Sequence, residues 1–164
     1  MNNVTPFLSF DGQAEEAAQF YVSLLPDSRI DRVTRSPMET PGGPAGTVLL
    51  VEFTLAGSPF MALNTPGFTF TEGVSLLIPT ADQAETDRVW AALIANGGEE
   101  MSCGWCKDRW GVVWQVTPVG MIDLLSDPDR NRARRAMEAM VQMIKIDIND
   151  VRRAAAPCSP AGIA

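Results

Sequence analysis

Two features of this 164-residue sequence could carry chemistry, a Cys-x-x-Cys pair and one isolated carboxylate, in a chain that contains no histidine. Cys103 and Cys106 form the pair. Such a pair is redox-active when its first thiol lies at a helix N-terminus, because the helix dipole lowers the thiol pKa. This segment precedes a predicted β-hairpin, and a structural zinc site would find only Cys158 as a further cysteine ligand. We therefore expect Cys106 to fill an apolar position as a small hydrophobic residue.

The isolated carboxylate is Glu52, the only acid in the apolar segments that we interpret as central strands of the first half. It could act as a general base if burial raised its pKa. On a pleated strand it could equally point outward to solvent. The absence of histidine excludes a Ser-His-Asp triad, a Cys-His pair and a His-ligated metal.

The composition indicates a globular protein, with 46% hydrophobic and 20% charged residues. The net charge of −7 argues against nucleic acid as the main partner. Residues 1–129 carry a net charge of −11 and residues 130–164 one of +4, which favours a basic helix face docked on the acidic body or an interaction tail. There is neither an N-terminal signal pattern nor an apolar run of about 18 residues, so we expect a cytoplasmic protein without a membrane partner.

The first half of the chain predicts the element order β-α-β-β-β. The predicted strands are residues 4–10, 28–36, 47–55 and 60–64, and the predicted helix is 13–25. The turn Asp11-Gly12 separates the first strand from the helix, and three prolines and three glycines make residues 37–46 a loop.

The second half repeats this order at an offset of about 69 residues. A strand at 73–79 is followed by Asp82 and Glu85 at the spacing of a capping box. The helix that begins there ends at Asn96-Gly97-Gly98. A short segment at 99–103 and a strand at 112–117 complete the second module.

The residues after Pro118 predict helices. We expect a helical turn at 121–125 and then one long helix that begins at Asp127-Pro128-Asp129. Its apolar stripe consists of Met137, Met140, Val141, Ile144 and Ile148, and it needs a hydrophobic groove on the body or on a partner. The predicted organisation is a single domain over 1–150, with modules at about 3–64 and 73–118, C-terminal helices at 120–150 and a flexible tail at 151–164.

The repeated modules and several local motifs resemble the vicinal-oxygen-chelate superfamily, and most closely its PhnB-like branch, often labelled 3-demethylubiquinone-9 3-methyltransferase. The residues that carry the resemblance lie roughly within 3–150. They are 10–17 (FDGQAEEA), Phe20-Tyr21, 51–53 (VEF), 60–64 (FMALN), Cys103-Gly104-Trp105, 107–109 (KDR), Gly111-Val112, 114–116 (WQV) and 137–148, which is similar to the branch's C-terminal helix.

The resemblance implies an α+β fold in which two βαβββ modules form cup-shaped mixed sheets that enclose a pocket, with helices at the C-terminus. Enzymes of the superfamily hold a divalent metal in this pocket through His and Glu on the first and last strands of the modules. The metal then acts as a Lewis acid on vicinal oxygens of the substrate.

This chain departs from that metal pattern. Gln115 stands where the last strand normally provides Glu, and a neutral amide is a poor ligand for a transition metal. The first strands offer Thr5, Phe7 and Ser9, and Ser75 and Leu77, in place of histidine. We therefore expect neither a metal nor another cofactor. A methyltransferase activity is also disfavoured, because the glycines at 41–44 lie between two strands and not between a parallel strand and a helix.

The resulting hypothesis is a protein of this fold that binds a small molecule without a metal. The candidate ligand-binding residues are Asn64, Ser75, Trp105, Arg109, Trp114 and Gln115. Two alternatives stay open: an enzyme for a small oxygenated metabolite that uses Glu52 or Gln115, and an interaction module that uses the terminal helix. We also expect a homodimer, with the Met-rich terminal helix at its interface.

Overall fold

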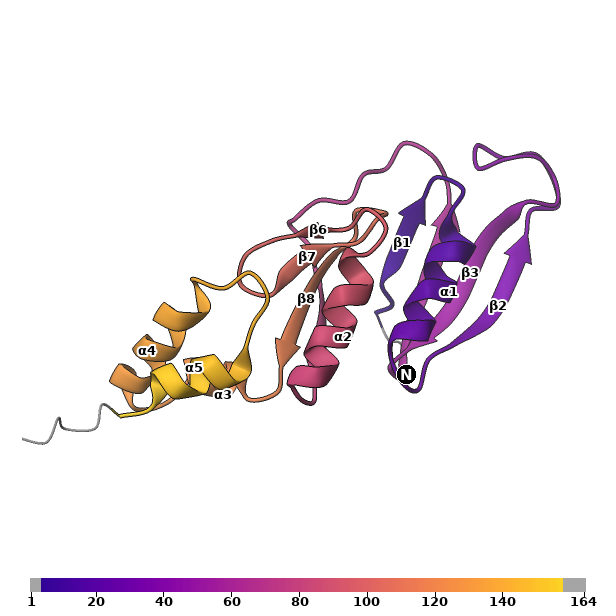
Figure 1. The fold of residues 1–164 in the computed structure, drawn as a ribbon. Coiled ribbons are helices and arrows are strands. Elements are labelled where there is room, and N and C mark those ends of the chain that lie inside the picture. The colour runs from indigo at the N-terminus through magenta and orange to yellow at the C-terminus, as the bar shows by residue number, and fades with distance from the viewer. Residues whose placement is uncertain (1–3, 158–164) are drawn as a thin grey trace, which may run out of the picture. The chain divides into compact units, whose positions relative to one another are not determined.

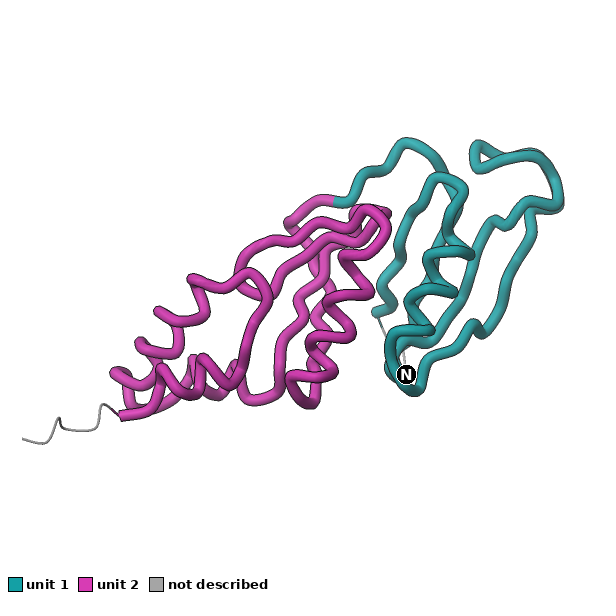
Figure 2. Tube along the Cα trace, viewed as in Figure 1, with its two compact units in different colours: residues 1–70 teal, residues 71–164 magenta. Residues whose placement is uncertain are grey.

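The computed structural model describes residues 4–157, and the chain divides into two compact units, Met1–Phe70 and Thr71–Ala164 (Figure 2). Each predicted module falls within one unit. Each unit contains a module with the element order β-α-β-β-β, so the α+β fold with an internal structural repeat is confirmed.

Unit 1 is a four-stranded mixed sheet with one helix (Figure 1). Its elements are β1 (Phe7–Phe10), α1 (Ala14–Leu24), β2 (Arg29–Arg35), β3 (Val48–Leu55) and β4 (Ser58–Asn64). The strand order is β1-β4-β3-β2, with β1 and β4 parallel and the other pairs antiparallel. Strand β4 begins at Ser58, two residues before the strand predicted at 60–64.

Helix α1 covers one face of this sheet and leaves the other face open. Val51 and Phe53 on β3 are buried beneath α1, where Tyr21 packs 6.4 Å from the ring of Phe53. Burying such side chains contributes about 1.5–3 kcal/mol each. Glu52, between them on β3, points to the opposite face, because successive side chains of a strand alternate.

Unit 2 repeats this architecture with shorter strands. Its module consists of β5 (Leu76–Thr80), α2 (Gln83–Ile94), β6 (Glu99–Glu100), β7 (Trp105–Lys107) and β8 (Val113–Pro118). The order β5-β8-β7-β6, with β5 parallel to β8, matches that of unit 1. The predicted capping box forms at α2: Asp82 Oδ1 accepts from the Glu85 amide at 2.8 Å, and Glu85 Oε2 accepts from the Ala81 amide at 2.7 Å.

As far as residue 157, the C-terminal part of unit 2 contains three helices, α3 (Met121–Leu125), α4 (Arg130–Met140) and α5 (Ile148–Ala155). The prediction of one long helix up to Ile148 is therefore wrong. The chain leaves the helix after Val141, and the carbonyls of Met143 and Ile144 accept hydrogen bonds from the Cys103 and Gly104 amides at 2.8 and 2.7 Å. A new helix starts at Asp147, whose carboxylate accepts from two amides of its first turn.

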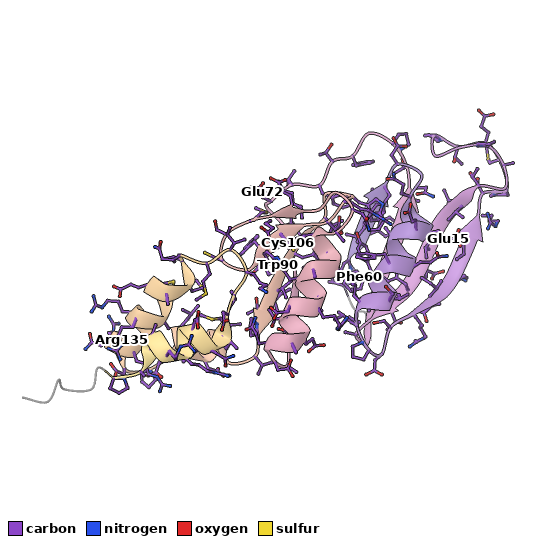
Figure 3. The ribbon with its side chains drawn as sticks, viewed as in Figure 1. Glu15, Phe60, Glu72, Trp90, Cys106 and Arg135 are labelled. Carbon is purple, nitrogen blue, oxygen red and sulfur yellow. The ribbon has the colours of Figure 1, made fainter. Side chains whose placement is uncertain are left out.

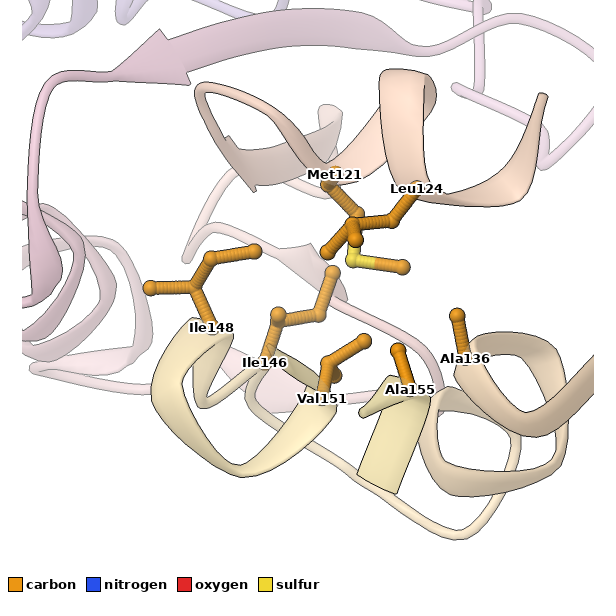
Figure 4. Packing of buried hydrophobic residues seen from close by; sticks show 7 residues of the cluster. All are labelled: Met121, Leu124, Ala136, Ile146, Ile148, Val151 and Ala155. Carbon is orange, nitrogen blue, oxygen red and sulfur yellow. The ribbon is translucent and has the colours of Figure 1, made fainter. Parts of the chain in front are cut away.

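These helices enclose a small hydrophobic core of their own (Figure 4). Its buried members are Met121, Leu124, Ala136, Ile146, Ile148, Val151 and Ala155. Three residues of the predicted stripe, Met137, Val141 and Ile144, remain 43–51% exposed. The prediction of a flexible tail from 151 is wrong as far as Ala155, which is helical and buried, and residues 158–164 lie outside the described part.

Within the described residues, no helix has the length and apolar character needed to cross a membrane.

Candidate functional site

The open face of the second sheet brings together three of the predicted ligand-binding residues, Ser75, Trp105 and Gln115. In the strand register, Gln115 on β8 lies between Leu77 on β5 and Trp105 on β7. Gln115 and Trp105 are half-buried, and Leu77 is 47% exposed. Their neighbours Trp114 and Cys106 are fully buried on the opposite face, because side chains alternate along each strand.

Gln115 is fixed by a hydrogen bond in which its Nε2 donates to Ser75 Oγ at 2.7 Å. This bond links the segment before β5 to the centre of the sheet. The Gln115 Oε1 atom has no hydrogen-bond partner among residues 4–157, so it can accept a hydrogen bond from an N–H or O–H group of a ligand.

A shallow depression of about 580 Å³ adjoins the cross-strand row formed by Leu77, Gln115 and Trp105. It is lined by Glu72, Met101, Ser102, Cys103 and Trp105. Figure 3 labels Glu72 in the segment that opens unit 2. Trp105 belongs to both the row and the depression, so its indole connects the polar pair Gln115–Ser75 to an apolar wall.

Lys107 follows Trp105 on the same side of β7 and is held by two carboxylates. Its Nζ lies 2.8 Å from Glu72 Oε1 and 3.7 Å from Glu99 Oε2. The hydrogen bond to Glu72 is the main reason why the pKa of Lys107 is raised above its ordinary value. The ammonium therefore stays charged and engaged at the edge of the site.

The turn at Cys103-Gly104 anchors this wall to the C-terminal helices. Both residues have left-handed backbone conformations, with φ of 61° and 81°. Their amides donate to the α4–α5 connection, and the Gly104 carbonyl accepts from the Val116 amide at 2.8 Å. A Cβ atom on Gly104 would lie 2.7 Å from Ile146 Cδ1, so this position needs glycine.

Trp114, a predicted ligand-binding residue, lies in the core. It is 1% exposed, and its Nε1 donates to Asp108 Oδ2 at 2.8 Å. Asp108 is itself 3% exposed, and its Oδ1 accepts from the Trp110 and Val112 amides at 2.9 and 3.1 Å. In the sequence, Asp108 is only part of the motif at 107–109, and the structure shows a buried carboxylate that organises the β7–β8 hairpin.

Arg109 lies in the connection between β7 and β8 and is exposed. Its Cζ atom lies 4.2 Å from the centre of the Trp110 ring, in a cation–π contact. This contact gives Arg109 a structural partner on the hairpin.

Asn64, in unit 1, has a structural role, because both polar atoms of its side chain form hydrogen bonds with the backbone. Its Oδ1 accepts from the Ala14 amide at 2.8 Å and its Nδ2 donates to the Val48 carbonyl at 2.9 Å. It is 4% exposed. Its side chain therefore satisfies the start of α1 and the start of β3, in a role that the sequence pattern did not indicate.

Glu52, the carboxylate considered as a general base, lies on the open face of the first sheet. It forms an ion pair with Arg32 on β2. The hydrogen bond from Arg32 is the main reason why the pKa of Glu52 is lowered. A general base near neutral pH needs the opposite shift.

The two cysteines of the Cys-x-x-Cys pair have different environments. Cys106 is fully buried, as predicted, and burial, followed by the nearby Asp108, raises the pKa of its thiol to about 12. Cys103 is half-buried in the wall of the depression. Cys106 is therefore an unreactive core residue.

The comparisons with known proteins identify the family. A family model described as 3-demethylubiquinone-9 3-methyltransferase matches residues 2–117. The chain belongs to this PhnB-like family. Among solved structures, a putative 3-demethylubiquinone-9 3-methyltransferase, PhnB protein, from Bacillus cereus is 35% identical, with a TM-score of 0.66, over 72% of this chain and 100% of its own.

Two further structures share less of the sequence. A Pseudomonas aeruginosa protein is 21% identical, with a TM-score of 0.61, over 72% of this chain and 98% of its own. A glyoxalase/bleomycin resistance protein from Albidiferax ferrireducens is 17% identical, with a TM-score of 0.45, over 68% of this chain and 93% of its own. Among curated proteins, none matches the chain.

The divalent metal of the superfamily's enzymes does not fit the donors of this PhnB-like chain. On the open face of the second sheet, the strand positions hold Leu77 and Gln115, and the Gln115 amide nitrogen already donates to Ser75. The described residues contain no group of three or more His, Cys, Asp or Glu side chains able to hold a metal ion. A neutral amide beside a leucine is not a ligand set for a transition metal.

Gly42 and Gly43, between Pro41 and Pro44, have a structural explanation in the PhnB-like fold. They lie in the loop between the antiparallel strands β2 and β3. A Cβ atom on Gly42 would come within 2.3 Å of the Asn64 carbonyl oxygen, so Gly42 allows a close backbone contact. The loop does not connect a parallel strand to a helix, which a nucleotide-binding loop requires.

The C-terminal helices lie outside the matched family region. The family model ends at residue 117, before β8 ends at Pro118. The Bacillus cereus protein is covered completely by 72% of this chain. The predicted likeness of residues 137–148 to a helix of the branch lies beyond the family-model match and stays a prediction.

Proposed function

We propose that this PhnB-like protein binds a small, largely apolar molecule, without a metal, at the open face of the β5-β8-β7-β6 sheet. The observation that carries the proposal is the hydrogen-bonded pair Gln115–Ser75 beside Trp105, next to the depression. A neutral amide, a hydroxyl and an indole form a surface for hydrogen bonding and stacking.

Each side chain then has a defined role in binding. Trp105 provides a flat apolar wall, and Gln115 Oε1 accepts a hydrogen bond from an N–H or O–H group of the ligand. Ser75 fixes the orientation of the amide by accepting from its nitrogen. Catalysis is not part of the proposal, because the ionisable groups beside the site, Lys107 and Glu72, are paired with each other.

The proposal is tested with the neutral fluorescent probe N-phenyl-1-naphthylamine on protein dialysed against a chelator, with the metal content checked by elemental analysis. We expect saturable binding that added Zn²⁺ or Mn²⁺ leaves unchanged. Trp105→Ala should weaken this binding about tenfold, because it removes the stacking wall.

The matched control is Trp110→Ala, which removes an indole of the same hairpin that does not line the depression. Binding that depends on added metal would overturn the proposal. So would binding that Trp105→Ala and Trp110→Ala reduce equally.

We also propose that the protein forms a homodimer through α4. Met137 and Val141 are exposed, and a shallow depression of about 420 Å³ along α4 includes Met137, Arg130 and Arg134. Residues 130–164 carry a net charge of +4 and residues 1–129 one of −11, so a second copy offers a surface of opposite charge. The occupant of the α4 surface is therefore a second copy of this chain.

The dimer is tested by light scattering after size-exclusion chromatography of the full chain. The double variant Met137→Glu/Val141→Glu should be monomeric at concentrations at which the wild type is dimeric, because it places charge in the apolar contact. Gln142→Glu, on an exposed neighbour, is the control for added negative charge. A monomeric wild type, or a double variant with an unchanged mass, would contradict the proposal.

A further inference from the structure

Among residues 4–157, the depression beside Trp105 has one charged side chain in its wall, the carboxylate of Glu72. The other lining groups are an indole, a thioether, a thiol and a hydroxyl, from Trp105, Met101, Cys103 and Ser102. The face of an indole carries negative electrostatic potential, and a thioether sulfur is polarizable. All these groups tolerate or attract a positive charge.

Lys107, two residues after Trp105 on β7, does not make the surroundings of the depression positively charged. It does not line the depression, and its ammonium is held by Glu72 at 2.8 Å and Glu99 at 3.7 Å. Two carboxylates thus face one ammonium, and the group carries a net negative charge. Because the pKa of Lys107 is raised, this arrangement persists at neutral pH.

We propose that the ligand is a small organic cation, a protonated amine attached to an apolar, aromatic body. This inference rests on the proposed function and adds the ligand class. The aromatic body stacks on Trp105, and the ammonium lies toward Glu72, where it shares the carboxylate with Lys107. An organic anion of the same shape would be repelled by the Glu72 carboxylate, and the described lining residues offer it no cationic side chain.

The experiment uses three probes with one ring system and different charge: tryptamine as the cation, 3-ethylindole as the neutral form and indole-3-propionate as the anion. Each competes with N-phenyl-1-naphthylamine at neutral pH and low ionic strength. We expect tryptamine to bind about tenfold more tightly than indole-3-propionate, with 3-ethylindole between them.

Glu72→Gln should reduce the ratio of the affinity for tryptamine to that for 3-ethylindole about fivefold or more. The affinity for 3-ethylindole itself should be unchanged. Asp123→Asn makes the same change of net charge on an exposed residue of α3 that does not line the depression, and it should leave the preference unchanged. A smaller preference in both variants would indicate an effect of overall charge and would overturn the assignment to Glu72.

The outcomes separate this inference from the proposed function. If all three probes displace the dye equally, or indole-3-propionate is preferred, the cation class is wrong and the binding site stands. If the dye itself binds without dependence on Trp105, both proposals fall.

Discussion

Replacement of Asp108 by alanine should lower the free energy of unfolding by about 3–5 kcal/mol. The Asp108 carboxylate accepts from the Trp114 Nε1, the Trp110 amide and the Val112 amide. Trp114 and Val112 are 1% and 3% exposed, so water does not replace the lost acceptor. Each buried donor left without a partner costs about 1–3 kcal/mol.

Asp108→Asn separates the loss of acceptors from the creation of a cavity. The amide keeps the size of the side chain but directs an NH2 group at one of the donors. We expect a cost of about 1–3 kcal/mol in urea unfolding followed by tryptophan fluorescence and near-ultraviolet circular dichroism. Asp123→Ala, on an exposed residue, is the control and should stay within about 0.5 kcal/mol of the wild type.

A double-mutant cycle identifies which donor matters. Trp114→Phe removes the Nε1 donor, so Asp108→Asn should cost less in that background than in the wild type, with a coupling of about 0.5–3 kcal/mol. Additive effects would show that the bond to Trp114 is not the reason for the burial of Asp108. The site depends on this outcome, because the β7–β8 register that Asp108 supports places Trp105 beside Gln115.

The sequence predicted those parts of the fold whose determinants are close together in the chain. Asp82 and Glu85 form their capping box because both partners lie within four residues of the helix start. The single long C-terminal helix was wrong for the opposite reason. Its periodicity is real, but the break after Val141 depends on the Cys103 and Gly104 amides, about 40 residues earlier in the chain.

The site residues were predicted on a different basis. Ser75 and Gln115 are 40 residues apart, and the resemblance, not local spacing, predicted them as polar groups of one pocket; their hydrogen bond forms where β5 pairs with β8. Asn64 and Trp114 have side chains that could equally bind a ligand, but their partners, the Ala14 amide and Asp108, are set by tertiary packing. Glu72 and Met101 carry no periodic signal, because they lie outside the strands and helices of unit 2.

Replacement of Gly104 by alanine should lower the free energy of unfolding by about 3 kcal/mol, through two separable effects. The first is backbone strain, since a φ of 81° costs an L-residue about 1–2 kcal/mol. The second is contact, because the new Cβ would lie 2.7 Å from Ile146 Cδ1 and 3.0 Å from the Val116 carbonyl oxygen. The Val116 oxygen belongs to the backbone of β8 and cannot move without disturbing the sheet.

Gly111 provides a matched control for the strain alone. Its φ is 87°, and a Cβ atom there would meet nothing within 4 Å, so Gly111→Ala should cost only about 1–2 kcal/mol. The excess at Gly104 measures how tightly the Cys103-Gly104 turn is packed against the segment before α5. Hydrogen exchange should therefore become faster at the Cys103 and Gly104 amides in Gly104→Ala and stay unchanged there in Gly111→Ala. Equal costs for the two variants would mean that Ile146 yields freely, and that the C-terminal helices do not depend on this turn for their attachment to the sheet that carries the site.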